Sequence, residues 1–277
     1  MQNALRYIIT LAVLGMAGPC LAQEAPEAAE DWTLTSVPDR KAVVAMIDFS
    51  SGLNIAARCV DGVYDLLITG LPEAEGRVFS RELGIQVGDD EEPYISVWTV
   101  GARRDAAFSR IPAPVARDLA QGGKLQVIVP ATATAPRTRY VMELVPSSTA
   151  IEQTLTACGR PLVDPREARS DQIDGNGQDG LPDTLQWQIV PRPTFPPPVN
   201  DRMPREGYVV MSCVVQGDGR LTECLSESEQ PPGFNLGRAV QRSLFQSKIR
   251  LSDRAAAAGL PLAGRMVRFS VNFKLQE

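Results

Sequence analysis

Residues 207–219, Gly-Tyr-Val-Val-Met-Ser-Cys-Val-Val-Gln-Gly-Asp-Gly, begin the stretch that decides the fold of this chain. An Asp-Gly pair between two β-rich runs is a strong hairpin signal, because the tightest turn needs positive φ at both central residues. With Asp218 and Gly219 at those positions, Cys213 lies directly opposite Cys224. Opposed Cα atoms of antiparallel strands are about 4.5–5.5 Å apart, a separation that a disulfide spans. The hairpin therefore predicts a Cys213–Cys224 disulfide.

The next residues predict a helix and then a strand. Residues 234–249 repeat Leu236, Val240 and Leu244 every four positions, which is typical of an amphipathic helix, and Asn235 is a candidate N-cap. Residues 267–275 alternate strictly between apolar and polar side chains, as a strand with one buried face does. The polar set is Arg268, Ser270, Asn272 and Lys274. Residues 207–275 thus predict a β-β-α-β unit with a three-stranded antiparallel sheet.

The order of motifs in this region resembles the TonB C-terminal domain family. In chain order the motifs are Phe195-Pro196, Gly207-Tyr-Val-Val, Val215-x-x-Asp-Gly-Arg-Leu, Leu236-x-x-Ala-Val, Gly259-x-Pro-x-x-Gly264 and Val267-x-x-x-Val271-x-Phe273. The resemblance covers residues 187–277. Two features depart from the family: no aromatic-x-Pro step follows the helix, and the paired cysteines are not general among its members.

The resemblance implies a protein-binding role. TonB-like domains bind extended peptides of partner proteins by adding a strand to an open sheet edge. We therefore expect a protein or peptide partner in the cell envelope, with a link to TonB-dependent transmembrane transport. If residues 267–275 form the edge, the partner-binding candidates are Arg268, Ser270, Asn272 and Lys274. The alternative is that these are ordinary solvent-facing residues, with Arg268 and Lys274 as charges that protect the edge from aggregation.

Composition argues against several other functions. The chain has 277 residues, room for two domains, and its net charge of −5 is unlike that of a basic nucleic-acid binder. It contains no histidine, which excludes Ser-His-Asp and Cys-His catalysis and histidine metal ligands. We predict no nucleic-acid partner, no small-molecule substrate, no cofactor and no catalytic residue. An enzyme or calcium-binding protein centred on the N-terminal domain is the alternative hypothesis.

The N-terminus indicates export. Arg6, an apolar run over 7–17 and small residues before Gln23 are typical of a signal peptide over 1–22, cleaved after Ala22. An acidic leader over 23–31, predicted to be disordered, follows. We expect a periplasmic protein that contacts the membrane only through its partners. A membrane-anchored transducer with an uncleaved leader is the alternative.

Cleavage would leave four cysteines in an oxidising compartment, which favours disulfides over free buried thiols. Besides Cys213 with Cys224, the remaining pair is Cys59 with Cys158. Their x10 and roughly x100 spacings lack the close cysteine pairs of a zinc site.

Residues 32–160 predict a β-sandwich-like domain, so that the whole chain is an α+β protein. Turn motifs such as Asp61-Gly62 separate eight candidate strands, and two helices are expected over 112–121 and 150–158. The strands are expected over 32–37, 42–49, 53–60, 63–69, 77–87, 95–100, 124–129 and 138–145. Residues 161–190 read as a linker, and 191–277 form the C-terminal domain.

One segment of the linker resembles a calcium loop. Asp174, Asn176, Asp179 and Asp183 offer oxygen ligands. With Asp174 at loop position 1, however, Gln178 stands at position 5 and Asp179 stands where the glycine belongs. A solvated Asp/Gly turn is therefore the favoured interpretation, and we predict no metal site there.

Overall fold

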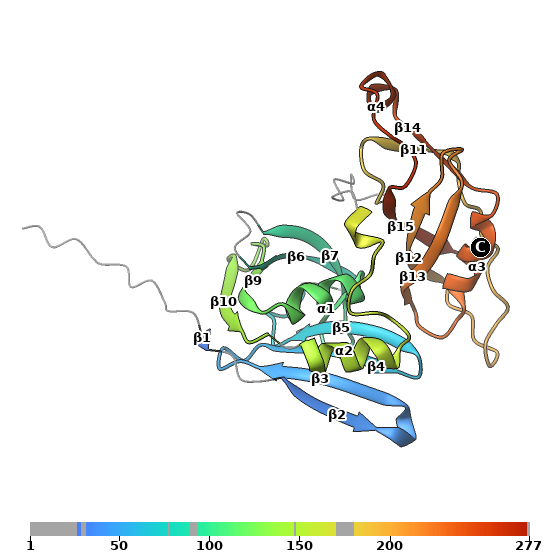
Figure 1. Cartoon of the computed structure of the whole chain (residues 1–277). Coiled ribbons are helices and arrows are strands. Elements are labelled where there is room, and N and C mark those ends of the chain that lie inside the picture. Colours follow the sequence, from blue (N-terminus) through green and yellow to red (C-terminus); the bar gives the residue numbers. More distant parts are fainter. Residues whose placement is uncertain are drawn as a thin grey trace, which may run out of the picture.

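The computed structural model describes residues 27–28, 32–76, 78–88, 93–146, 148–169 and 180–275. These residues are mostly strand with a few short helices, arranged around a large sheet and a three-stranded sheet (Figure 1). The predicted signal peptide and the calcium-loop residues Asp174, Asn176 and Asp179 lie outside the described residues.

The N-terminal part is one ten-stranded sheet in the order β1-β10-β9-β6-β7-β8-β5-β4-β3-β2, antiparallel except for the parallel pair β1–β10. The predicted sandwich of two sheets differs from this arrangement. The short strand β8 pairs with β7 on one side and β5 on the other, so it joins all strands into a single sheet. The strands are β1 (Glu27–Ala28), β2 (Thr33–Val37), β3 (Ala42–Asp48), β4 (Asn54–Val60), β5 (Val63–Thr69), β6 (Ser80–Val87), β7 (Tyr94–Val100), β8 (Ala107–Ser109), β9 (Gly123–Val129) and β10 (Thr138–Leu144).

Two helices, α1 (Pro112–Ala120) and α2 (Ser148–Ala157), lie side by side against this sheet (Figure 1). Helix α1 begins with Pro112 and is followed by Gly122 at φ 72°, as the sequence predicts. Buried alanine and leucine side chains of both helices join the strand residues in one apolar core. The predicted disulfide Cys59–Cys158 ties the residue after α2 to β4, with a Cα–Cα distance of 5.6 Å.

The C-terminal sheet has the order β13-β12-β15, with β12 (Glu206–Val215) in the centre. β13 spans Leu221–Gln230 and β15 spans Met266–Lys274, and both pair antiparallel with β12. Helix α3 (Leu236–Leu244) covers one face of the sheet, on the side away from the N-terminal part (Figure 1). Beneath it, Phe269 and Phe273 pack edge-on against Trp187 and Phe195, with ring centroids 4.9 and 5.3 Å apart.

The hairpin turn differs in detail from the prediction. Gly219 has positive φ but Asp218 does not, and Gln216 pairs with Arg220, so the loop has three residues instead of two. That loop would misalign the cysteines by one position. A bulge at Glu223, with φ 49°, inserts one residue into β13 and restores the alignment. Cys213 and Cys224 are therefore disulfide-bonded, with Cα atoms 4.1 Å apart.

The other Asp-Gly pair forms the two-residue turn. Val60 pairs directly with Val63, and both Asp61 and Gly62 have positive φ, at 49° and 79°. The same dipeptide thus makes different turns in the two hairpins.

The predicted helix over 234–249 is too long. Helix α3 ends at Leu244, and Ile249 lies instead on β14 (Lys248–Leu251), paired with β11 (Leu185–Ile189). The short helix α4 (Asp253–Ala257) then precedes β15. Asn235 occupies the N-cap position, but its side chain makes no capping bond. The carboxylate of Glu229 on β13 caps the helix instead, since it accepts the Gly237 N–H at 2.8 Å.

The two disulfides should differ in their contribution to stability. Chain entropy predicts about 4.7 kcal/mol for the Cys59–Cys158 loop and about 3 kcal/mol for the much shorter hairpin loop. The double variant Cys59→Ser/Cys158→Ser is therefore expected to lose more unfolding free energy in urea than Cys213→Ser/Cys224→Ser. Equal losses would contradict a loop-entropy origin.

Candidate functional site

The outer edge of β15 presents the backbone groups of the four predicted partner-binding residues. Leu275 N–H donates to Arg205 at 2.8 Å, and Val215 N–H donates to Arg265 at 2.9 Å. Both bonds join opposed residues in the β12–β15 register, so the odd-numbered residues of β15 bond to β12. The N–H and C=O groups of Arg268, Ser270, Asn272 and Lys274 therefore point away from β12. No described strand pairs with that side of β15.

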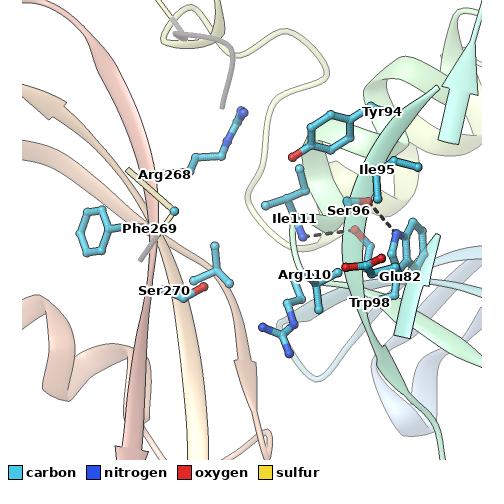
Figure 2. Close-up of a pocket in the computed structure, with 14 residues that line it drawn as sticks. Glu82, Tyr94, Ile95, Ser96, Trp98, Arg110, Ile111, Arg268, Phe269 and Ser270 are labelled. Carbon is cyan, nitrogen blue, oxygen red and sulfur yellow. Dashed lines mark hydrogen bonds between the residues drawn. The ribbon is translucent and has the colours of Figure 1, made fainter. Parts of the chain in front are cut away.

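The side chains of these four residues lie on the sheet face opposite α3. Phe269, between two of them, points away from this face into the core under the helix (Figure 2). Asn272 and Lys274 are exposed, and Ser270 is half-buried. Arg268 differs from the expectation of a solvent-facing residue, because its side chain is only 11% exposed and forms a salt bridge with Glu167 at 3.2 Å.

The N-terminal part covers this same face. A cavity of about 290 Å³ lies between β15 and β7, lined by Ser270 and Val210 on one wall and by Ile95, Val97 and Trp98 on the other (Figure 2). The hydroxyls of Thr99 and Tyr208 also share a hydrogen bond between the two sheets.

A network of buried charges joins the two sheets beside the cavity. Its centre is Arg166, which binds the Asp164 carboxylate at 2.7 Å and donates to the Glu223 carbonyl of β13 at 2.8 Å and to Ser212 of β12 at 3.2 Å. Glu227, only 3% exposed, accepts from Ser212 and pairs with Arg160 at 2.9 Å. We call residues 160–167, which carry Arg160, Asp164 and Arg166 of this network, the junction segment.

Helix α1 anchors the junction segment from the N-terminal side. Buried Arg117 donates to the Pro161 carbonyl at 3.0 Å and pairs with Glu167 at 2.8 Å. Glu167 in turn accepts from Arg268 of β15. The range predicted as a linker therefore begins with a packed, charged clamp, and it also contains strand β11. The signal that sequence reasoning missed was the alternation of Arg160, Asp164, Arg166 and Glu167 directly after a disulfide-bonded helix.

The electrostatics of the clamp favour the charged form of Asp164. Burial alone would raise the pKa of this carboxyl, but hydrogen bonds from Arg166 and the charges of Arg166 and Arg117 together hold the pKa below its usual value. The pKa of Arg166 is raised, because pairing with Asp164 and Glu227 outweighs the effect of its burial. Both groups remain ionised at neutral pH, and each depends on the other.

A second, polar cleft of about 550 Å³ lies on the β13 side of the junction. Its lining includes Arg58, Asp65, Tyr208, Glu229 and Arg238. Burial raises the pKa of Asp65, although Arg58 donates two hydrogen bonds to this carboxylate. This ion pair serves to neutralise a carboxylate next to the core.

The described residues bring together no metal-binding group of three or more histidine, cysteine or carboxylate side chains. Of the four calcium-loop candidates, only Asp183 is among the residues that the structure describes. None of the helices described is both long and apolar enough to cross a membrane.

Comparison with protein-family models, with curated proteins and with solved structures finds no match to this chain. The functional argument therefore depends on the geometry of the two sheets and their junction.

Removal of the buried Arg166 should cost more unfolding free energy than removal of an arginine that forms an exposed salt bridge. Arg166→Gln leaves two buried carboxylates short of a partner, which is expected to cost about 3 kcal/mol or more of unfolding free energy. The matched control is Arg169→Gln, three residues along, whose pair with Glu223 is 39% and 52% exposed and contributes about 0–1 kcal/mol. Denaturant unfolding of both variants measures the difference, and similar losses would show that the clamp is not what holds the junction.

Asp164 should also make the unfolding free energy depend on pH in the acid range. Because its folded pKa lies below the unfolded value, its contribution is complete above about pH 4 and disappears as the pH falls below that. Asp164→Asn is expected to be less stable than the wild type at pH 7, with the difference shrinking as the pH falls through the lowered folded pKa of Asp164. Unfolding free energies across this range test the expectation. Glu223→Gln, which removes an exposed carboxylate, is the control. A stability difference between Asp164→Asn and the wild type that stays constant with pH would contradict the prediction.

Proposed function

We propose that this chain is an exported protein-interaction protein. Its C-terminal part, which resembles a TonB C-terminal domain, binds an extended segment of a periplasmic envelope partner along the outer edge of β15. The observation that carries the proposal is the row of outward-pointing backbone groups on Ser270, Asn272 and Lys274, beside which no described strand lies.

The coverage of the C-terminal sheet supports this edge over every other surface of the sheet. Helix α3 packs on one face, and the N-terminal part packs on the other. At the opposite edge, carbonyls of β13 already accept from arginine and glutamine side chains, at Glu223, Cys224 and Ser226. β15 is therefore the strand to which a partner has access.

The usable length of the edge follows from its neighbours. Gly180 lies against Arg268 and Phe269, so that a Cβ on Gly180 would be 3.0 Å from the Phe269 Cα. An incoming strand consequently begins at Ser270 and runs to Lys274. Over these residues it would gain main-chain hydrogen bonds for affinity and side-chain contacts with exposed Asn272 and Lys274 for selectivity.

The two disulfides support the proposed compartment. Such bonds persist in oxidising environments, among them the bacterial periplasm, which agrees with a signal peptide over 1–22. A role in TonB-dependent transport is part of the proposal and derives from the family resemblance.

A proline at the edge tests the proposal. Asn272→Pro removes an N–H that points away from β12, so the ladder inside the sheet stays intact while an added strand loses one hydrogen bond and meets the proline ring. We expect Asn272→Pro to lose the envelope partner that the wild type retains in affinity capture, and Asn272→Ala, which keeps the N–H, to retain it.

Site-specific photocrosslinking supplies the second measurement. A crosslinker at position 272 should capture the same partner, whereas one at Arg238 on α3 should not. Equal capture by the proline and alanine variants, or crosslinking only from α3, would refute binding at the β15 edge.

A further inference from the structure

A second strand edge is open in the N-terminal sheet, on β7. β7 has seven residues but its neighbour β8 has only three, and the β8 pairing covers Trp98 to Val100 alone. The reason is local: Pro112 begins helix α1, so the chain leaves the sheet after Ser109. Among the described residues, therefore, 94–97 of β7 have a strand on one side only.

The hydrogen-bond register shows which groups are unpaired. Val100 N–H donates to Phe79 at 2.9 Å in the β6–β7 register, so the even-numbered residues of β7 bond to β6. The backbone groups of Ile95 and Val97 point outward, and no described residue bonds to them. Both residues line the cavity between the two sheets.

The side chains along this edge are apolar and exposed. Tyr94 is 48% exposed, Ile95 53% and Val97 36%. Natural proteins usually protect an open edge with charges, prolines or bulges, and this one has none over 94–97. Such an edge is suited to receive a strand with its own β-branched or aromatic side chains.

Arg110 favours a ligand that carries a negative charge. Its guanidinium stacks on the Tyr208 ring at 4.2 Å and extends from the β7 side into the space between the sheets (Figure 2). It forms no salt bridge with any described residue, and its buried Nε has no hydrogen-bond partner. A guanidinium that is partly desolvated in this way favours a carboxylate, which can accept two of its N–H groups at once.

Two polar pairs of the cavity wall are already hydrogen-bonded, and a carboxylate on it limits the ligand's charge. Trp98 donates to Ser96 at 2.9 Å, and Ile111 N–H donates to Ser109 at 3.2 Å (Figure 2). Glu82 lies on the same wall and disfavours a ligand with several negative charges. The cavity volume corresponds to about ten water molecules, enough for a short segment of chain.

We propose that the 94–97 edge of β7 binds an extended peptide segment of a partner protein that carries apolar side chains and a single carboxylate, with the carboxylate on Arg110. The segment would continue the line of β8 and lie between β7 and the Val210–Ser270 face of the C-terminal sheet. This site lies on β7, whereas the proposed function uses β15, so each proposal can be correct or wrong without the other.

Peptide selection with the whole oxidised protein tests the inference. A phage library of random heptapeptides, panned on the wild type, is expected to enrich for β-forming residues next to one Asp or Glu. Synthetic copies should bind Arg110→Gln about tenfold more weakly, while Arg110→Lys should retain part of the affinity. Ile95→Pro, which removes an outward N–H, should abolish binding. Ile95→Val, which keeps the N–H and most of the apolar side chain, should retain most of the affinity, and Asn272→Pro, on the other sheet, should not change it.

Hydrogen exchange gives a readout that does not depend on the proline variant folding. Saturation of the wild type with an enriched peptide should slow exchange of the Ile95 and Val97 amides and leave the Asn272 amide unchanged. The inference is overturned if no peptide is enriched, if the enriched peptides show no acidic preference, or if they bind Ile95→Pro as well as the wild type.

Discussion

The structure depends on the ionic clamp formed by Arg166 with Asp164 and by Glu227 with Arg160. These groups are buried, where an unpaired charge would be costly. The Arg160–Glu227 pair and the bonds from Arg166 to Ser212 and the Glu223 carbonyl form only when the C-terminal sheet is docked on the junction segment. Because the partners come from α1, the junction segment, β12 and β13, the clamp specifies a position as well as stabilising it. Apolar contacts alone would allow the sheets to slide, but opposed charges at fixed points do not.

This docking determines which strands a partner can reach. The face of β12 and β15 opposite α3 would be solvent-exposed in an isolated three-stranded sheet, and here the N-terminal part covers it except at Asn272 and Lys274. Tyr208, Ser212 and Arg268 are all engaged across the junction. Among the described strands, the edge of β15 and the 94–97 edge of β7 both lie next to the junction and have no strand beside them. The edge of β15 is polar, with Asn272 and Lys274, whereas the edge of β7 is apolar with one arginine beside it. The chemistry of the two edges differs, so they would select different segments.

Local patterns predicted the elements well where the chain itself decides them. Alternation predicted β15 with its buried residues, the Asp-Gly pairs predicted both hairpins, and the Pro-to-Gly span predicted α1. The hairpin register predicted the Cys213–Cys224 disulfide, and Cys59–Cys158 followed as the remaining pair of cysteines. The errors have tertiary causes. Ile249 continues the helical pattern of α3 but pairs with β11, a strand more than fifty residues earlier. The cap of helix α3 comes from Glu229 on a neighbouring strand, and no local sequence motif predicts this contact.

The candidate site divides in the same way. The sequence by itself determined that Arg268, Ser270, Asn272 and Lys274 share one side of a strand, because side chains alternate with a period of two. It also determined which cysteines can pair. Only the tertiary structure decided that the backbone groups of these residues point outward, that Arg268 is buried against Glu167, and that β7 has an open edge. Those properties depend on which strand lies next to which, and long-range pairing is set by the whole core and not by any one segment.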